Sequence, residues 1–277
     1  MDAKRILFIT SEISPYLPDT SIANICRELP QGIQERGKEI RTFMPKYGSI
    51  NERRNQLHEV IRLSGMNLII DDTDHPLLIK VASIQSARMQ IYFIDNDDYF
   101  HRRYTVSDAN GREFDDNDER SIFYARGVLE TVKKLRWVPD LVHCHGWITA
   151  LAPLYIKKAF CDDPCYKNAK VVYSIYDDEF KNPLHDGFSQ KLMQDGITPP
   201  DLEAIQGTVD FVALSKLAID HSDGIIQSSP TVNNEVVEYA KNLKDKSFLE
   251  YQPEDAYMDS FNTFYDEILS SVTTHKK

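Results

Sequence analysis

Short runs of consecutive apolar residues alternate along the chain with stretches in which apolar residues recur every three or four positions. The first run, residues 5–10 (RILFIT), is typical of a strand buried on both faces of a parallel sheet. Apolar residues then recur at helical spacing from Ile22 to Ile33, and Gly37 predicts the end of that helix. A further strand at 39–45 completes a β–α–β unit, whose crossover is almost always right-handed.

The same alternation continues beyond residue 200. Residues 58–95 predict strands and hairpins, and a long helix is predicted from 116 to 137, with Asn117 or Asp118 as its cap. Further strands are expected within 139–145, 169–177 and 224–229, with helices within 148–160, 210–220 and 231–243. This order predicts an α/β fold, a single Rossmann-like domain with a doubly wound, mostly parallel sheet.

Charge and cysteine content narrow the class of protein. The 277 residues carry a formal net charge of -11, which argues against nucleic acid as a partner because phosphate binding needs a basic surface. The four cysteines are too unevenly spread for a disulfide framework, and Cys161 and Cys165 lack a second pair at zinc-site spacing. We therefore predict no metal and no cofactor.

The beginning of the chain, MDAKRILFIT, has no long apolar segment of the signal-peptide kind and runs directly into a strand pattern. No apolar run approaches the length needed to span a membrane. These two observations predict a cytoplasmic protein that has no membrane partner.

Candidate chemistry lies in the loops that follow the predicted strands, because the ligand crevice of an open α/β sheet lies at the carboxyl ends of its strands. These loops carry carboxylates and imidazoles, which either support acid–base chemistry or simply face water. They are Glu12, Asp19, Asp97, Asp98, His143, His145, Asp177, Asp178, Glu179 and His185.

The loop after the first strand, LPDTSIAN, argues against tight phosphate binding. A phosphate-binding turn needs glycines that let backbone amides approach the ligand, and this loop has neither glycine nor lysine. Asp19 would repel a diphosphate. The alternative is an ordinary helix start, capped by Asp19, Thr20 or Ser21.

The segment HCHGW, residues 143–147, contains two histidines that point the same way if the strand extends through both. A metal pair is not expected, because no third ligand can be named. The better functional interpretation is a substrate-facing His145 at the strand end, with His143 supporting it from below.

Several segments, in order, resemble the bacterial glycogen synthases and plant starch synthases. Residues 6–48 resemble that family's opening, with Ser-Glu after the strand, Leu-Pro in the helix and Pro-x-Tyr after the next strand. Residues 139–157 resemble its Pro-Asp-x-x-His-x-His-Asp-Trp segment very closely. Weaker matches are 116–132, 171–177 and 217–236, so the resemblance covers about residues 5 to 237.

The resemblance implies a retaining transfer of glucose from ADP-glucose or UDP-glucose to an α-1,4-glucan, and one half of an architecture with two Rossmann-like domains. It implies that His145 is catalytic, touching the donor sugar, and that Tyr99 lies near the acceptor. Ser11 and Glu12 match the pair that begins the nucleotide loop. The other ligand-binding candidates are Asp19, Thr20, Asn24, His143, Trp147 and Asp177.

The departures from the family fall where the donor would bind. Residues 18–21 replace Lys-Thr-Gly-Gly, Asn24 replaces the loop's aspartate, and Gly146 replaces the aspartate after the second histidine. Tyr176 and Asp177 replace a His-Asn pair. The family's second nucleotide-binding domain is not expected in this chain, and a leaving phosphate without cations or dipoles would be a poor leaving group. We therefore predict that the chain is inactive alone.

The end of the chain predicts a helix, with aromatic and aliphatic residues at i, i+3 and i+4 spacing between 257 and 268. It resembles the helix that, in two-domain glycosyltransferases of this fold, crosses back onto the first domain. We therefore predict a synthase-type domain over residues 1–250 and a C-terminal helix and tail over 251–277 that pack on the same domain.

Three functions remain open. The first is a synthase-like module that binds α-glucan or a protein partner without transferring glucose, with weak binding of α-glucan or ADP-glucose. The second is a transferase whose site is completed in trans by another polypeptide or a dimer mate. The third is a module for an unrelated small ligand. A surface that lines an interdomain cleft in the family predicts a homodimer or a partner-bound state.

Overall fold

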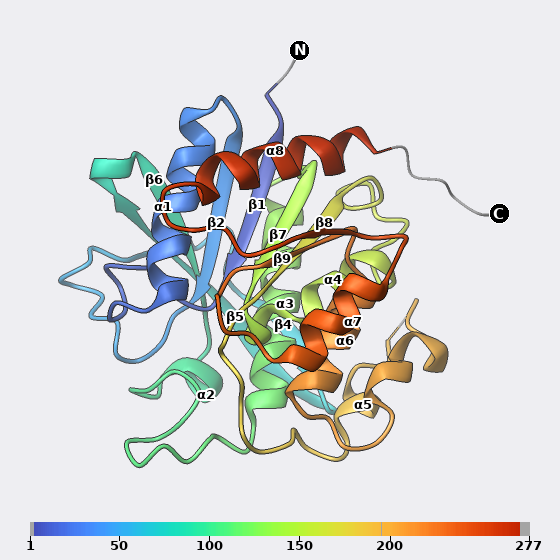
Figure 1. Ribbon diagram of the computed structural model, residues 1–277. Coiled ribbons are helices and arrows are strands. Elements are labelled where there is room, and N and C mark those ends of the chain that lie inside the picture. The colour runs from blue at the N-terminus through green and yellow to red at the C-terminus, as the bar shows by residue number, and fades with distance from the viewer. Residues whose placement is uncertain (1–2, 195, 272–277) are drawn as a thin grey trace.

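A ten-stranded sheet runs through the computed structural model, which describes residues 3–194 and 196–271 (Figure 1). Its order is β10-β9-β8-β7-β1-β2-β6-β5-β3, and β4 pairs with β5 beside this path. The strands are β1 (Arg5–Thr10), β2 (Glu39–Pro45), β3 (His58–Glu59), β4 (Met66–Ile70), β5 (Thr73–Ile84), β6 (Met89–Asp95), β7 (Leu141–His145), β8 (Lys170–Ile175), β9 (Gly224–Gln227) and β10 (Ser247–Leu249).

The strands from β10 to β6 are parallel, and β5 joins them as an antiparallel neighbour. The predicted α/β fold with a mostly parallel sheet is therefore confirmed. Chain order reverses at β1, whose neighbours are β2 on one side and β7 on the other. In this kind of sheet the ligand crevice opens at the reversal, so the loops after β1 and β7 lie where a site is expected.

Helices cover both faces of the sheet. Alternate residues of β1 separate the two cores: Ile6 and Phe8 pack with α1 and α8, while Leu7 and Ile9 belong to the larger core on the other face. The helices are α1 (Ser21–Glu35), α2 (Asp97–Phe100), α3 (Asn117–Lys134), α4 (Leu151–Lys157), α5 (Phe188–Lys191), α6 (Phe211–Asp220), α7 (Asn234–Asn242) and α8 (Tyr257–Ser270), with 3-10 turns η1 (Gln85–Ala87), η2 (Trp147–Thr149) and η3 (Pro199–Ile205).

Helix α8 crosses the front of the sheet beside α1, far in sequence from the strands it covers (Figure 1). Phe261, Phe264 and Tyr265 are buried against Phe8 of β1 and other residues of the central strands. Met258 lies so close to Gly32 of α1 that a side chain there would collide with it. The helix and the sheet thus share one core, and residues 272–277 of the predicted tail lie outside the described residues.

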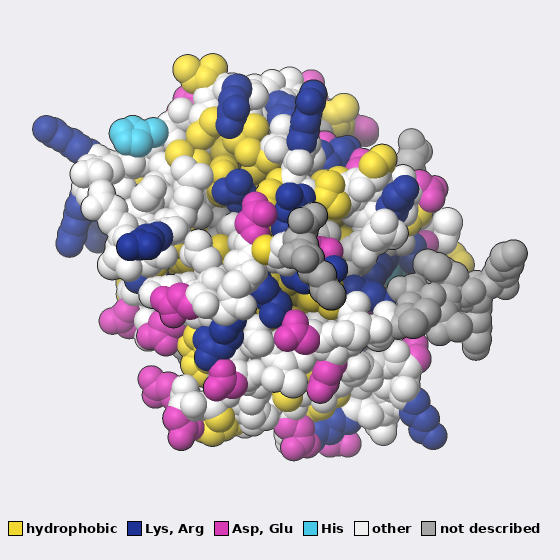
Figure 2. All heavy atoms as spheres, turned by 90° about the horizontal axis from the view of Figure 1, so that it is seen from above, with side chains coloured by type: hydrophobic (Ala, Val, Ile, Leu, Met, Phe, Trp, Pro, Cys, Tyr) yellow, Lys and Arg dark blue, Asp and Glu magenta, His cyan; other side chains and the backbone are white. Residues whose placement is uncertain are grey.

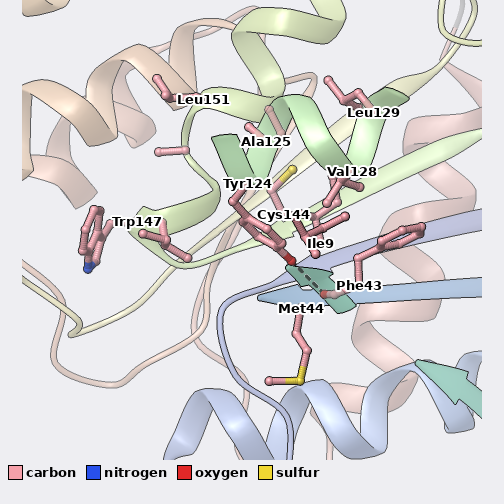
Figure 3. Packing of buried hydrophobic residues seen from close by; sticks show 14 of the residues in the cluster. Ile9, Phe43, Met44, Tyr124, Ala125, Val128, Leu129, Cys144, Trp147 and Leu151 are labelled. Carbon is pink, nitrogen blue, oxygen red and sulfur yellow. Dashed lines mark hydrogen bonds between the residues drawn. The ribbon is translucent and has the colours of Figure 1, made fainter. Parts of the chain in front are cut away.

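Tyr124 of α3 fixes the carboxyl ends of two central strands from the opposite face (Figure 3). Its hydroxyl lies 2.9 Å from the carbonyl oxygen of Phe43 in β2 and 2.6 Å from that of Thr10 in β1. Tyr124 is fully buried, so these contacts are shielded from water. Tyr124 therefore holds in place the end of β1, from which the loop that begins at Ser11 starts.

The predicted cap of α3 was wrong. The capping position is Asp116, whose side chain makes no capping hydrogen bond, and the helix begins at Asn117. The two predicted caps are engaged elsewhere: the Asn117 amide donates to the carbonyl of Val106, and the Asp118 carboxylate accepts from Lys191. Tertiary partners have displaced the local capping interaction that the sequence favours.

Candidate functional site

A cavity of about 270 Å³ lies at the carboxyl ends of the central strands. Four strands, β1, β2, β7 and β8, each end directly before a segment that lines it. The cavity therefore occupies the position where a doubly wound sheet is expected to bind its ligand. Its lining residues are Ser11, Glu12, Ile22, Tyr47, Thr105, Val106, Trp147, Ile148, Asp177, Asp178 and Glu179.

The beginning of α1 is closed by the chain's own side chains. The Thr20 hydroxyl accepts a hydrogen bond from the Ala23 amide at 3.0 Å, which is an ordinary helix cap. The same hydroxyl donates to the Glu12 carboxylate at 2.5 Å. Asp19, immediately before the cap, accepts from the Ser14 hydroxyl. The positive end of this helix thus faces carboxylates of its own chain, so it is poorly placed to attract a diphosphate.

Glu12 is held in this position by the turn after β1. The Thr10 hydroxyl both donates to the Glu12 carbonyl and accepts from the Glu12 amide, at 2.7 and 3.0 Å. Burial raises the pKa of the Glu12 carboxyl, and the hydrogen bond from Thr20 opposes that rise. Ser11 lines the cavity beside it.

Asp178 is the second acid of the cavity and lies against Gly146. Its Oδ2 accepts from the Trp147 amide at 2.8 Å, and a Cβ on Gly146 would lie 2.6 Å from the same oxygen. The carboxyl of Asp178 therefore fills the space that a side chain at position 146 would enter. Burial is the main cause that raises the pKa of Asp178 to about 7.

Two buried polar atoms of the cavity lining lack a partner among the described residues. One is the hydroxyl of Tyr47, a residue only 1% exposed, and the other is Oδ1 of Asp178. Buried polar groups are usually satisfied, so such atoms are natural contacts for a ligand or for water. Together they offer a hydroxyl donor and a carboxyl group.

A groove of about 610 Å³ adjoins the cavity, and Asp177 lines both. It contains the predicted residues Asp19 and Asn24 beside the start of α1. Thr20 instead lines a smaller hollow of about 340 Å³ next to Glu12, together with Arg103 and other residues. Seven of the ten predicted site residues therefore gather around the strand ends: Ser11, Glu12, Asp19, Thr20, Asn24, Trp147 and Asp177.

The structure places His143 and His145 on the face of β7 that α8 covers. Their ring centroids are 3.8 Å apart, so they point the same way, as the alternation of a strand requires. His143 contacts the Tyr265 hydroxyl of α8 at 2.5 Å and the Ser174 hydroxyl at 2.7 Å. Both histidines are fully buried, and neither lines the cavity.

His145 has one free nitrogen. Its Nδ1 lies 2.8 Å from the Tyr176 hydroxyl, while Nε2 has no partner among the described residues. Burial lowers the pKa of His145 to about 3, so its ring is neutral near pH 7. In this conformation His145 cannot touch a ligand in the cavity.

Tyr99 also lies away from the cavity. It is 3% exposed, and its hydroxyl lies 2.8 Å from Glu119 of α3 and 2.9 Å from His75 of β5. Lys191 of α5 completes this polar cluster by donating to Glu119 at 2.6 Å. Tyr99 of α2 therefore connects β5 and α3 through its hydroxyl group.

The strand-end cavity is lined by acids, whereas the amino end of the sheet carries charges of both signs. Lys4 and Lys38 directly precede β1 and β2, and Lys246 precedes β10. Figure 2 looks onto this amino end and shows lysine and arginine side chains interspersed with aspartate and glutamate side chains. At the carboxyl end, Glu12, Asp178 and the other acids line the cavity, and its described lining includes no lysine or arginine. A phosphate group would meet like charge there.

Three contributions to the site were not among the residues selected from the sequence. Tyr47 follows β2 within the Pro-x-Tyr match, and Asp178 was one of many strand-end acids. Residues 251–261, which line the groove, carry no signal of a site on their own. In the described residues no group of three His, Cys, Asp or Glu side chains could hold a metal ion, and no helix is long and apolar enough to cross a membrane.

Comparison with known proteins decides the family. Residues 5–248 match the family described as the starch synthase catalytic domain. The chain belongs to this family. It is 32% identical over 234 residues to a glycogen synthase of Chlorobium limicola, covering 84% of this chain and 47% of that protein. It is 32% identical over 274 residues to a glycogen synthase of Chlorobaculum tepidum, covering 98% of this chain and 54% of that protein.

The starch synthase fold is also found among solved structures. The catalytic domain of starch synthase IV from Arabidopsis thaliana, bound to ADP and acarbose, superposes with a TM-score of 0.73 at 18% identity. The match covers 90% of this chain and 51% of that one. This likeness supports the same fold for this chain. The chain spans about half the length of the curated relatives it matches.

Proposed function

We propose that this starch-synthase-type chain binds α-glucan at the strand-end cavity and does not by itself transfer glucose from a nucleotide sugar. The observation that carries the proposal is the closed start of α1. Thr20 and Glu12 occupy the helix end with a hydroxyl and a carboxylate, in the loop where the family resemblance expects lysine and glycines. A donor diphosphate would have to displace them and approach Asp19 as well.

The same cavity suits a neutral, hydroxyl-rich ligand. Carboxyl groups such as that of Glu12 accept hydrogen bonds from hydroxyl groups, and such bonds are stronger when the carboxyl is ionised. The hydroxyl of Tyr47, which has no partner among the described residues, is a hydrogen-bonding group in the wall of the cavity. Trp147, a residue 5% exposed, adds an aromatic wall. The Arabidopsis structure bound to acarbose makes an α-glucan the natural candidate.

Transfer activity is tested with radiolabelled ADP-glucose and glycogen. The purified chain is expected to incorporate no label, while the Chlorobaculum tepidum glycogen synthase in a parallel reaction does. Label incorporated by the chain alone would contradict the proposal.

Glucan binding is tested by native gels with and without glycogen. The chain should be retarded in the gel that contains glycogen, and unchanged mobility would contradict glucan binding and favour an unrelated ligand.

A second candidate function is a transferase completed in trans. The observation that favours it is coverage: the chain spans 47% and 54% of the two glycogen synthases compared above, so those proteins contain further residues that this chain does not match. A second polypeptide or a dimer mate would then supply the donor site. Mixing the chain with a synthase from the same cell should raise label incorporation above the synthase alone. Light scattering at high protein concentration tests the homodimer directly.

A further inference from the structure

The groove beside the cavity has three walls from distant parts of the chain. The start of α1 contributes Asn24 and Glu28, the end of β9 contributes Gln227 to Pro230, and the segment before and within α8 contributes Tyr251 to Phe261. Its volume is about 610 Å³, and it opens to solvent beside exposed residues such as Asn24. The walls from α1 and α8 meet because these two helices pack against each other.

The chemistry of these walls selects a neutral polar ligand. The described lining of the groove includes four acids and no lysine or arginine, so binding of an anion is disfavoured. The acids are Asp19, Glu28, Asp177 and Glu254. Amide side chains of Asn24, Gln227 and Gln252 supply both donors and acceptors. This mixture of carboxylates, amides and rings complements hydroxyl groups on a ligand that also has apolar C–H faces.

Tyr251 is an available aromatic surface in this groove. It is 40% exposed, precedes α8, and its hydroxyl makes no hydrogen bond within the described residues. The Asn24 side chain is likewise exposed and without a hydrogen-bond partner there. Phe261, in contrast, is 2% exposed and belongs to the core beneath the groove. An aromatic ring and an amide are therefore free to contact a ligand without disturbing the core.

Asp177 connects the groove to the cavity. It lines both, and the Ser229 and Thr231 hydroxyls donate to its two carboxylate oxygens at 2.9 and 3.3 Å. Asp177 is nevertheless exposed, so its remaining lone pairs can accept from a ligand. A chain-like molecule could pass this residue from one hollow into the other.

We propose that the groove is a subsite for a neutral oligosaccharide chain that continues from the strand-end cavity, with Tyr251 as its stacking platform. This inference rests on the proposed glucan binding. It specifies the ligand class: the protein takes an extended stretch of glucan, not a single sugar or a disaccharide.

Isothermal titration with maltose and maltoheptaose tests the length dependence. The wild-type chain should bind maltoheptaose more tightly than maltose, because only the longer chain reaches the groove. Tyr251→Ala should lower the affinity for maltoheptaose about fivefold or more, the effect of a significant interface aromatic, and leave maltose unchanged. Tyr251→Phe keeps the ring and should retain the affinity, while Ile69→Ala, at a 60% exposed position in the β4–β5 hairpin, is the control.

The outcomes separate the inference from the proposed function. Equal affinity for maltose and maltoheptaose in the wild-type chain would overturn the groove subsite and leave glucan binding at the cavity intact. An equal loss for both sugars in Tyr251→Ala would overturn it as well. Failure of the wild-type chain to bind either sugar would overturn the proposed function and the inference with it. Circular dichroism of each variant confirms that the fold is retained.

Discussion

Asp178 is the acid of the cavity lining whose pKa is shifted to near neutrality. Burial raises its pKa to about 7, whereas an aspartate in an unfolded chain titrates near 3.8. Between these two values the folded protein holds a proton that the unfolded chain has lost. Stability contributed through this group is therefore present at low pH and is lost as the pH rises through the window from about 4 to 7.

Asp178→Asn removes this titration and should stabilise the protein relative to wild type increasingly as pH rises from 5 to 8. We expect a gain on the order of 2 kcal/mol in the free energy of unfolding at pH 8 and a smaller one at pH 5. Urea unfolding at both values measures it. The control is Asp162→Asn, at an exposed position that does not line the cavity. A difference that stays constant with pH would contradict the assignment.

Position 146 requires a glycine for two reasons, its backbone conformation and the closeness of Asp178. Its φ is +79°, and an added Cβ would meet the Asp178 carboxylate at 2.6 Å. Gly111 has nearly the same φ, +78°, but a Cβ there would meet nothing within 4 Å. Gly146→Ala should therefore destabilise by about 1–3 kcal/mol more than Gly111→Ala, which carries the backbone strain alone. Equal losses in denaturant unfolding would show that the contact with Asp178 is unimportant.

The sequence could predict many of the residues at the strand ends but not which of them face a ligand. Glu12, Asp177 and Trp147 were selected because each follows a recognisable strand. Tyr47 was not selected, because a tyrosine after a strand becomes notable only when its hydroxyl is found buried and unpartnered. His145 illustrates the converse: strand alternation gives its face, but the helix that covers that face lies more than 100 residues later.

At the scale of elements, α8 is the segment on which the core of one sheet face depends. We propose that residues 251–271 and the preceding chain form one folding unit. Phe264 is 4% exposed and lies 2.9 Å from where a Cβ of Gly224 would stand. The ring therefore packs directly on the backbone of β9, where no side chain intervenes.

Phe264→Ala should lower the free energy of unfolding by about 3–5 kcal/mol, because it leaves a cavity against the sheet. Asp259→Ala on the same helix is the matched control. Its ion pair with Arg36 is at the surface, with the aspartate side chain 84% exposed, and should contribute less than about 1 kcal/mol. Chemical denaturation measures both. A Phe264→Ala protein as stable as the control would show that α8 is only loosely attached.

The elements themselves follow from the sequence because parallel strands are apolar runs and their helices are amphipathic. Strand β10 was missed, since its three residues offer only Phe248 and Leu249 as an apolar signal. The cap of α3 failed for a different reason. Asn117 and Asp118 have partners in distant loops and helices, and no local pattern reveals such contacts.

At the scale of the whole molecule, we propose that the acids lining the strand-end cavity disfavour anionic ligands. Glu12→Gln combined with Asp19→Asn removes two negative charges beside α1 without changing side-chain size. A charge near 4 Å is worth about 1 kcal/mol in water, or about fivefold in affinity, so the loss of two should tighten ADP binding by up to about thirtyfold at low salt. Titration at low and high salt checks the cause, because the gain should shrink as salt rises. Unchanged ADP affinity would contradict the electrostatic explanation.

We propose that this starch-synthase-type fold has kept a place for the glucan and closed the place for the donor diphosphate. The most direct measurement is a pair of calorimetric titrations on one preparation of the chain, with maltoheptaose and with ADP-glucose. We predict a saturable heat for maltoheptaose and none for ADP-glucose at the same concentration. Saturable binding of ADP-glucose without binding of maltoheptaose would contradict the claim.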